Sequence, residues 1–153
     1  MSNDRSQLSQ QARAALARND IATAHTIARN LLAGSPYYAD GHYLTARVAL
    51  AQRQIAAAIH AFRECLKLDK RHLEAVVELS DVLLKSGQHG QSFFVLKAHA
   101  DELLKTSRMS FTAAELFSRL GMHQDALPYY KRANHLQGDV PIIEAGLAAC
   151  ATK

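Results

Sequence analysis

Residues 107–140 read SRMSFTAAELFSRLGMHQDALPYYKRANHLQGDV, and their pattern decides the fold of the chain. Apolar residues recur at helical spacing on both sides of Gly121, which predicts a helix, a short turn and a second helix. Small residues fall where the two helices would touch, at Ala114, Ala126 and Ala133, and the aromatic Tyr130 follows on the second helix. Because backbones can approach closely at such positions, this stretch predicts a tightly packed helical hairpin.

The same pattern recurs every 34 residues without any insertion. Successive units begin at Arg5, Ala39, Leu73 and Ser107, and a further one begins at Pro141. The turn position holds Asn19, Arg53, Gly87 and Gly121. The eighth position holds Ala12, Ala46, Ser80, Ala114 and Ala148, and the twentieth holds Ala24, Ala58, Ser92 and Ala126. A recurrence of this kind predicts a stack of helical hairpins.

This order of small and aromatic positions at a period of 34 residues resembles the tetratricopeptide repeat (TPR) family. The resemblance covers nearly the whole chain and implies an all-α fold, a right-handed superhelical solenoid of antiparallel helix hairpins. We therefore expect a single TPR domain over residues 1–153. Its four full repeats would span 5–38, 39–72, 73–106 and 107–140, followed by a terminal helix over 141–152.

The composition is that of a folded domain without a targeting or membrane segment. The chain has 153 residues, of which 48% are hydrophobic, and this is enough for one substantial core. Its start, MSNDRSQLSQ, lacks the apolar core of a signal peptide, and no apolar run approaches the length of a membrane span. A cytoplasmic location is the default expectation. Cys65 and Cys150 stand at positions suited to small side chains, and we interpret them as packing residues.

The net charge of +4 raises the question of nucleic acid binding. The excess is mild and lies near the N-terminus, where residues 1–53 hold six basic and three acidic side chains. No basic cluster with interleaved aromatics and none of the standard nucleic-acid motifs is present. We therefore expect no nucleic acid partner.

The resemblance also implies where a partner would bind. In the family, the first helix of each repeat lines the inner wall of the superhelix, and this wall is a binding groove. The fifth repeat positions would place an apolar and aromatic strip there: Tyr43, Val77 and Phe111. The ninth and thirteenth positions would add charge: Arg13, Arg47, Asp81, Glu115, Lys85 and Arg119. We predict that these residues bind a peptide or protein segment with an apolar centre, and that part of their charge is paired internally.

Other chemistry is disfavoured by what the sequence holds. Capture of an acidic chaperone tail, a known family function, needs basic residues where this chain has Glu74 and Glu78. No Gly-rich phosphate loop, nucleophile elbow or pair of carboxylates in a plausible cleft appears, so we expect no catalysis and no cofactor. His89 and His123 share one repeat position, but no third ligand accompanies them, so we interpret them as packing residues and expect no metal.

Two more specific readings accompany the general one. Residues 118–151 resemble the last repeats of the helical region that precedes the catalytic domain in bacterial TPR-containing sulfotransferases. This resemblance implies an accessory region of a larger enzyme, although the chain itself holds nothing that would bind a sulfuryl donor. The other reading is a freestanding secretion chaperone of bacterial type, which would hold an extended segment of another protein.

The last predicted helix, PIIEAGLAACATK, lacks a partner helix. We expect Leu147 and Ala148 to face the preceding repeat, and Ile143, Cys150 and Ala151 to face outward. An exposed apolar end is unfavourable in a repeat stack. We therefore expect either that the chain continues past Lys153 or that a homodimer covers this helix.

Overall fold

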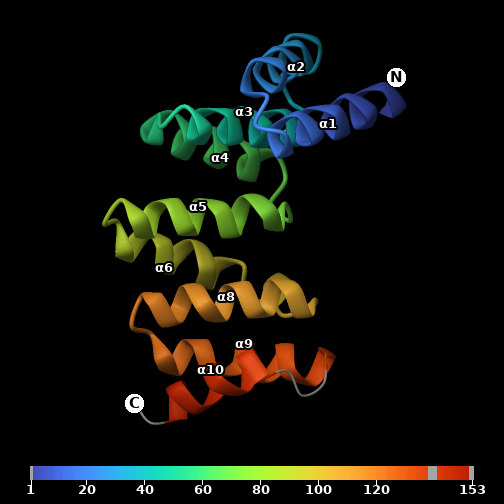
Figure 1. Ribbon diagram of the computed structural model, residues 1–153. Helices are drawn as coiled ribbons and strands as arrows, with labels where there is room; N and C mark the ends of the chain where they lie inside the picture. The colour runs from blue at the N-terminus through green and yellow to red at the C-terminus, as the bar shows by residue number, and fades with distance from the viewer. Residues whose placement is uncertain (1, 138–140, 152–153) are drawn as a thin grey trace. The chain divides into compact units, whose positions relative to one another are not determined.

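The computed structural model describes residues 2–137 and 141–151, and all of its regular elements are α-helices (Figure 1). The helices pair into hairpins, which confirms the predicted all-α class and hairpin architecture. Within the described ranges, no helix is long and apolar enough to cross a membrane. The chain divides into two compact units, residues 1–75 (unit 1) and residues 76–153 (unit 2). The extent of the domain and the repeat boundaries stay predictions.

Unit 1 contains two helical hairpins and the start of a further helix. The first hairpin pairs α1 (Ser2–Ala17) with α2 (Ile21–Gly34), and the second pairs α3 (Ala39–Ala51) with α4 (Ile55–Leu68). Helix α3 also packs against α1 and α2. The unit ends in the first turn of α5 (Leu73–Lys85).

Unit 2 begins within α5 and contains the remaining helices. These are α6 (His89–Ala98), α7 (Ala100–Leu103), α8 (Ser107–Arg119), α9 (His123–Gln137) and α10 (Pro141–Ala151). Helices α8 and α9 form a hairpin, and α10 packs against α9. The Ser92 hydroxyl joins α6 to α5 by donating to the Ser80 carbonyl oxygen at 2.7 Å.

The turn inside each hairpin contains a residue in the left-handed conformation, at the position that the repeat predicted. The φ angles are 60° at Asn19, 61° at Arg53, 81° at Gly87 and 77° at Gly121. In each turn the following amide bonds a carbonyl five residues back, as Gln54 does to Ala49 at 2.8 Å. This is the Schellman bond that ends a helix. Glycine adopts this conformation without steric cost and asparagine tolerates it, so Arg53 is the strained member of the set.

The small repeat positions lie where the helices pack most closely. All eight in the four full repeats are 0% exposed, namely Ala12, Ala46, Ser80, Ala114, Ala24, Ala58, Ser92 and Ala126. Neither serine leaves its hydroxyl without a partner, because Ser80 donates to the Val76 carbonyl oxygen and Ser92 to the Ser80 carbonyl oxygen. Serine can therefore replace alanine here without the cost of an unpaired buried hydroxyl.

Helices α5 and α6 form a further hairpin, which differs from the others because its second helix is interrupted at His99. In a continuous helix the His99 amide would bond the Val95 carbonyl oxygen. Instead, His99 Nδ1 donates a hydrogen bond to the Val95 carbonyl oxygen at 2.8 Å. The His99 amide donates to the Leu96 carbonyl oxygen at 3.2 Å. Competition between the side chain and its own backbone thus separates α6 from α7.

The orientation predicted for the last helix was wrong at Cys150 and Ala148, whereas Leu147, expected to face the preceding repeat, is half-buried. Cys150 was expected to face outward and is buried, whereas Ala148 was expected to pack inward and is exposed. The reason is Gly146, which shares a helix face with Cys150 and lies against the Tyr130 ring. A Cβ added at Gly146 would lie 2.6 Å from Tyr130 Cζ, so the missing side chain is what lets α10 approach α9 on this face. The side chains of Ile143 and Ala151 lie outside the described residues.

Candidate protein-binding surfaces

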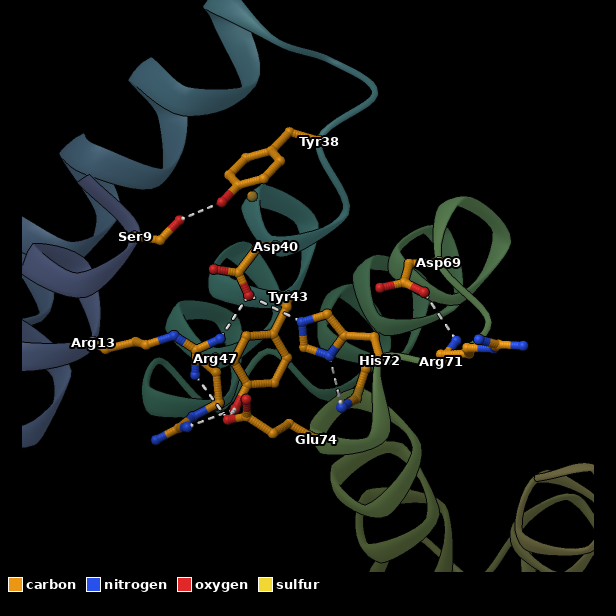
Figure 2. Close-up of polar contacts among 12 residues, drawn as sticks. Ser9, Arg13, Tyr38, Asp40, Tyr43, Arg47, Asp69, Arg71, His72 and Glu74 are labelled. Atoms are coloured by element: carbon orange, nitrogen blue, oxygen red, sulfur yellow. Dashed lines mark hydrogen bonds and ion pairs between the residues drawn. The ribbon is translucent and has the colours of Figure 1, made fainter. Parts of the chain in front are cut away.

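Arg13 lies at the centre of a charged cluster in unit 1 (Figure 2). This Arg13 cluster comprises Arg13, Asp40, Tyr43, Arg47, His72 and Glu74. Arg13 Nη2 bonds Asp40 Oδ1 at 2.6 Å, and Arg13 Nη1 bonds Glu74 Oε2 at 2.8 Å. Both carboxylates belong to the first turns of their helices, α3 and α5, where the helix dipole favours negative charge. One guanidinium on α1 therefore connects the starts of two other helices.

Tyr43 packs beneath the arginines of the Arg13 cluster. The Arg13 and Arg47 guanidinium carbons lie 4.8 Å and 5.9 Å from the centroid of its ring, within cation–π range. Its hydroxyl accepts a hydrogen bond from Arg47 Nη1 at 3.0 Å and donates one to Glu74 Oε2 at 3.3 Å. Because Tyr43 is only 1% exposed, its ring offers no face to a ligand in this structure.

His72 supports the cluster from the residue just before α5. Its Nε2 lies 2.9 Å from Asp40 Oδ1, and its Nδ1 accepts a hydrogen bond from the Ala75 amide at 3.3 Å. An accepting ring nitrogen has no proton, so these two bonds assign the proton to Nε2. The imidazole therefore satisfies one of the amides at the start of α5 while it holds Asp40 in place.

The charges of the Arg13 cluster stabilise one another. Burial alone would raise the pKa of Asp40, but the hydrogen bond from His72 and the charge of Arg13 outweigh it and hold that pKa below its usual range. Burial likewise opposes the charge on Arg13, and Asp40 and Glu74 together still raise its pKa. The pairing thus favours the charged forms of both Asp40 and Arg13.

A second cluster, the Asp81 cluster of Asp81, Lys85 and Arg119, lies in unit 2. Asp81 Oδ2 is 2.8 Å from Lys85 Nζ, and Asp81 Oδ1 is 2.7 Å from Arg119 Nη1. The pair with Arg119 joins α5 to α8. Although burial opposes the charge on Asp81, its bonds to Lys85 and Arg119 lower its pKa. The internal pairing expected from the sequence is present here.

The remaining predicted site residues lie on α5 and α8. Val77 and Phe111 are half-buried, and the Phe111 ring packs edge-on against Tyr130, with centroids 6.1 Å apart. Glu115 accepts a hydrogen bond from the Tyr130 hydroxyl. Burial, and then this bond, raise the pKa of Tyr130 to about 12. Phe111 and Glu115 are therefore connected through a tyrosine of the second helix of the same hairpin.

The structure brings the predicted residues together in two groups, one in each unit. Arg13, Tyr43 and Arg47 meet in unit 1, and Asp81, Lys85 and Arg119 meet in unit 2. Asp40 was not among the predicted site residues, and Glu74 was predicted only to disfavour a basic clamp. Both stand at the second position of their repeats, a position that faces inward in the family. Their repeat position could therefore have identified them as site residues. The binding roles of all these residues stay predictions.

No other reactive or metal-binding site is apparent in the described ranges. They contain no group of three histidine, cysteine or acidic side chains that could hold a metal ion. His89 is exposed and His123 is half-buried. Both cysteines are free and buried, and burial raises the pKa of the Cys65 thiol to about 12, which makes its reactive thiolate rare.

Comparison with known proteins connects this architecture to one class of solved structures. No protein-family model matches the chain, and no curated protein is similar to it in sequence. A thermophilic TPR protein of Thermus thermophilus matches with a TM-score of 0.74 and 20% identity, over 95% of this chain and 80% of that one. PilF of Pseudomonas aeruginosa matches with a TM-score of 0.80 and 20% identity, over 99% and 69%. YrrB, described as a TPR protein with an unusual peptide-binding site, matches with a TM-score of 0.70 and 14% identity, over 95% and 75%.

These similarities define the fold as that of TPR proteins. This fold is typical of scaffolds for protein–protein interaction, and its repeat domains are generally non-catalytic. The comparisons give no support to the predicted relation with sulfotransferases or to a homodimer.

Proposed function

We propose that the chain is a non-catalytic interaction module that binds a peptide or protein segment on the first helices of its hairpins. The observation that supports this is the convergence of Arg13 from α1 and Arg47 from α3 on one tyrosine, Tyr43. The two arginines occupy the same repeat position in consecutive repeats. The repeat thus gathers matched hydrogen-bond donors on one surface.

The chemistry of the two units differs. Guanidinium groups bind carboxylate and carbonyl oxygens with directed N–H donors, so unit 1 suits the polar part of a segment. Unit 2 has the half-buried side chains of Val77 and Phe111, which suit apolar contact. The description of YrrB supports a peptide as a ligand for this fold. A secretion-type chaperone is a finer form of the same proposal, since it would hold an extended segment through the same residues.

A selection from a displayed library of random linear peptides tests the proposal. The purified chain should enrich a set of related peptides, and Arg47→Ala and Phe111→Ala should each weaken their binding. Arg29→Ala is the matched control, because Arg29 is exposed on the second helix α2 of unit 1 and should leave binding unchanged. Absence of enrichment, or equal binding by wild type and both site variants, would refute the proposed function.

A cytoplasmic location and a bacterial source stay predictions from the sequence. The argument for a homodimer weakens because Cys150, expected on the uncovered side of α10, packs inward.

A further inference from the structure

The residue before α5 and the residue before α8 satisfy the start of their helices with different chemistry. His72 and Thr106 stand at the same repeat position, 34 residues apart. The Thr106 hydroxyl oxygen accepts a hydrogen bond from the Met109 amide at 3.2 Å, and His72 Nδ1 accepts one from the Ala75 amide at 3.3 Å. Each side chain thus pairs an amide that the first turn leaves free. A hydroxyl oxygen accepts at any ordinary pH, but an imidazole nitrogen accepts only while it has no proton.

Protonation of His72 would break its bond to Ala75 and strengthen the opposite side of the ring. Nε2 lies 2.9 Å from Asp40 Oδ1, and this bond becomes a charge-assisted ion pair when the imidazole is positive (Figure 2). The ring also packs on Tyr43, with centroids 4.7 Å apart, and only 11% of the His72 side chain is exposed to water. Asp40 and Tyr43 both belong to α3. The protonated ring therefore stays on α3, and the start of α5 is the part that gives way.

The other charges near His72 act in both directions. The titratable and charged groups around His72 and Asp40 come from every neighbouring element, namely Arg13 on α1, Asp40 and Tyr43 on α3, Cys65 on α4, Asp69 and Arg71 in the loop before α5, and Glu74 on α5. Asp40 and Glu74 favour a positive imidazole, whereas Arg13 opposes it. The amides at the start of α5 oppose it as well, because the N-terminal end of a helix carries partial positive charge. A protonated ring is thus attracted by Asp40 and repelled by the backbone that it holds when neutral.

We infer that His72 is a pH-sensitive cap for α5. In its neutral form the imidazole holds the Ala75 amide. In its protonated form it releases the first turn of the helix and stays paired with Asp40. The equivalent cap at Thr106 has no titratable atom and does not switch.

Release of this turn reaches the rest of the Arg13 cluster. Glu74 belongs to the first turn of α5, and its carboxylate bonds Arg13 and the Tyr43 hydroxyl. These two bonds loosen in the same step, because the backbone that carries Glu74 is no longer held. The switch operates in the free chain and does not depend on the proposed function.

An NMR titration of the full ¹⁵N-labelled chain tests the cap without a partner. The titration runs from about pH 8 to about pH 5, the interval in which histidine side chains ordinarily change charge. At the upper end, the imidazole ¹⁵N signals of His72 should show a proton on Nε2 and none on Nδ1. As the ring gains its second proton, the Ala75 amide should lose about two- to thirtyfold in exchange protection, corrected for the intrinsic effect of pH. This range corresponds to the loss of a side-chain cap, about 0.5–2 kcal/mol.

Two comparisons separate this effect from a general response to acid. The Met109 amide is an internal control, because its partner Thr106 does not titrate, and its protection should stay constant. His72→Thr is the matched variant, since it gives α5 the residue that caps α8. Its Ala75 amide should remain protected over the whole range.

The wild-type titration alone can overturn the inference. A proton on Nδ1 at the upper end, an imidazole that stays neutral throughout, or protection of Ala75 that does not follow the ionisation of His72 would each do so. An equal loss of protection in His72→Thr would do so as well. A loss at Ala75 that has the midpoint of the His72 imidazole and is absent from the threonine variant supports the inference. The library selection is performed at one pH and tests the proposed function separately.

Discussion

Replacing Tyr43 by alanine tests whether this ring belongs to the core or to an open binding surface. Its ring is 1% exposed and packs against Phe62 and His72, with centroids 6.0 Å and 4.7 Å away. Removal of a buried aromatic side chain costs about 3–5 kcal/mol, because it loses apolar burial and leaves a cavity. For a chain of this size, that corresponds to a fall in melting temperature of roughly 6–20 °C.

Tyr43→Phe provides the matched comparison. It keeps the ring and removes only the hydroxyl, which bonds Arg47 and Glu74. Loss of these bonds should cost about 0.5–1.5 kcal/mol, or roughly 1–6 °C. Thermal unfolding followed by circular dichroism measures both variants. If the melting temperature of Tyr43→Ala equals that of wild type, the ring is not a core residue and the description of the Arg13 cluster is wrong.

Three further changes test the fold and its charges. Arg53→Gly should stabilise the chain by about 0.5–1 kcal/mol and Gly121→Ala should destabilise it by a similar amount, because a left-handed residue with a Cβ is strained. Urea unfolding measures both, and a change in the free energy of unfolding with the same sign for the two variants would contradict this. Ala126→Leu should cost about 1–3 kcal/mol by overpacking a fully buried position, and an unchanged urea midpoint would show that the helices there are not in close contact. The lowered pKa of Asp40 means that its ionised form stabilises unit 1 above about pH 4 and that this contribution is lost as pH falls through the lowered value. The advantage of wild type over Asp40→Asn in melting temperature should therefore shrink between about pH 6 and pH 3, and a constant difference would count against the pairing.

The backbone architecture could be predicted because it depends on local residue size and turn chemistry. Only small side chains fit at Ala58 or Ala126, where helices pack closely, and such positions recur at a fixed period that the sequence displays directly. The turns follow from the same local logic, since Gly87 and Gly121 adopt positive φ without a steric cost.

The charged site could be predicted only in part because its pairs join distant residues. Arg13 bonds Asp40 and Glu74, which lie 27 and 61 positions along the chain. Repeat positions indicated that such residues face the same way, but which carboxylate meets which guanidinium depends on side-chain conformations. The burial of the Tyr43 ring has the same origin, because its repeat position does not reveal how deeply its side chain packs.

Departures from the regular repeat were also beyond a pattern argument. The break at His99 depends on one side chain that competes for the Val95 carbonyl oxygen. The orientation of α10 depends on the close approach of Gly146 to Tyr130, and an average repeat has no equivalent of this contact. Each departure results from a single contact rather than from periodicity.

The proposed function places the partner on the first helices of the hairpins. The most direct test is a two-dimensional ¹⁵N–¹H NMR titration of the labelled chain with a library-selected peptide. The largest shifts should fall on α1, α3 and the start of α5 in unit 1, or on α5 and α8 in unit 2. Shifts confined to α2, α4 or α9 would contradict the proposed function, because the partner would then bind the second helices.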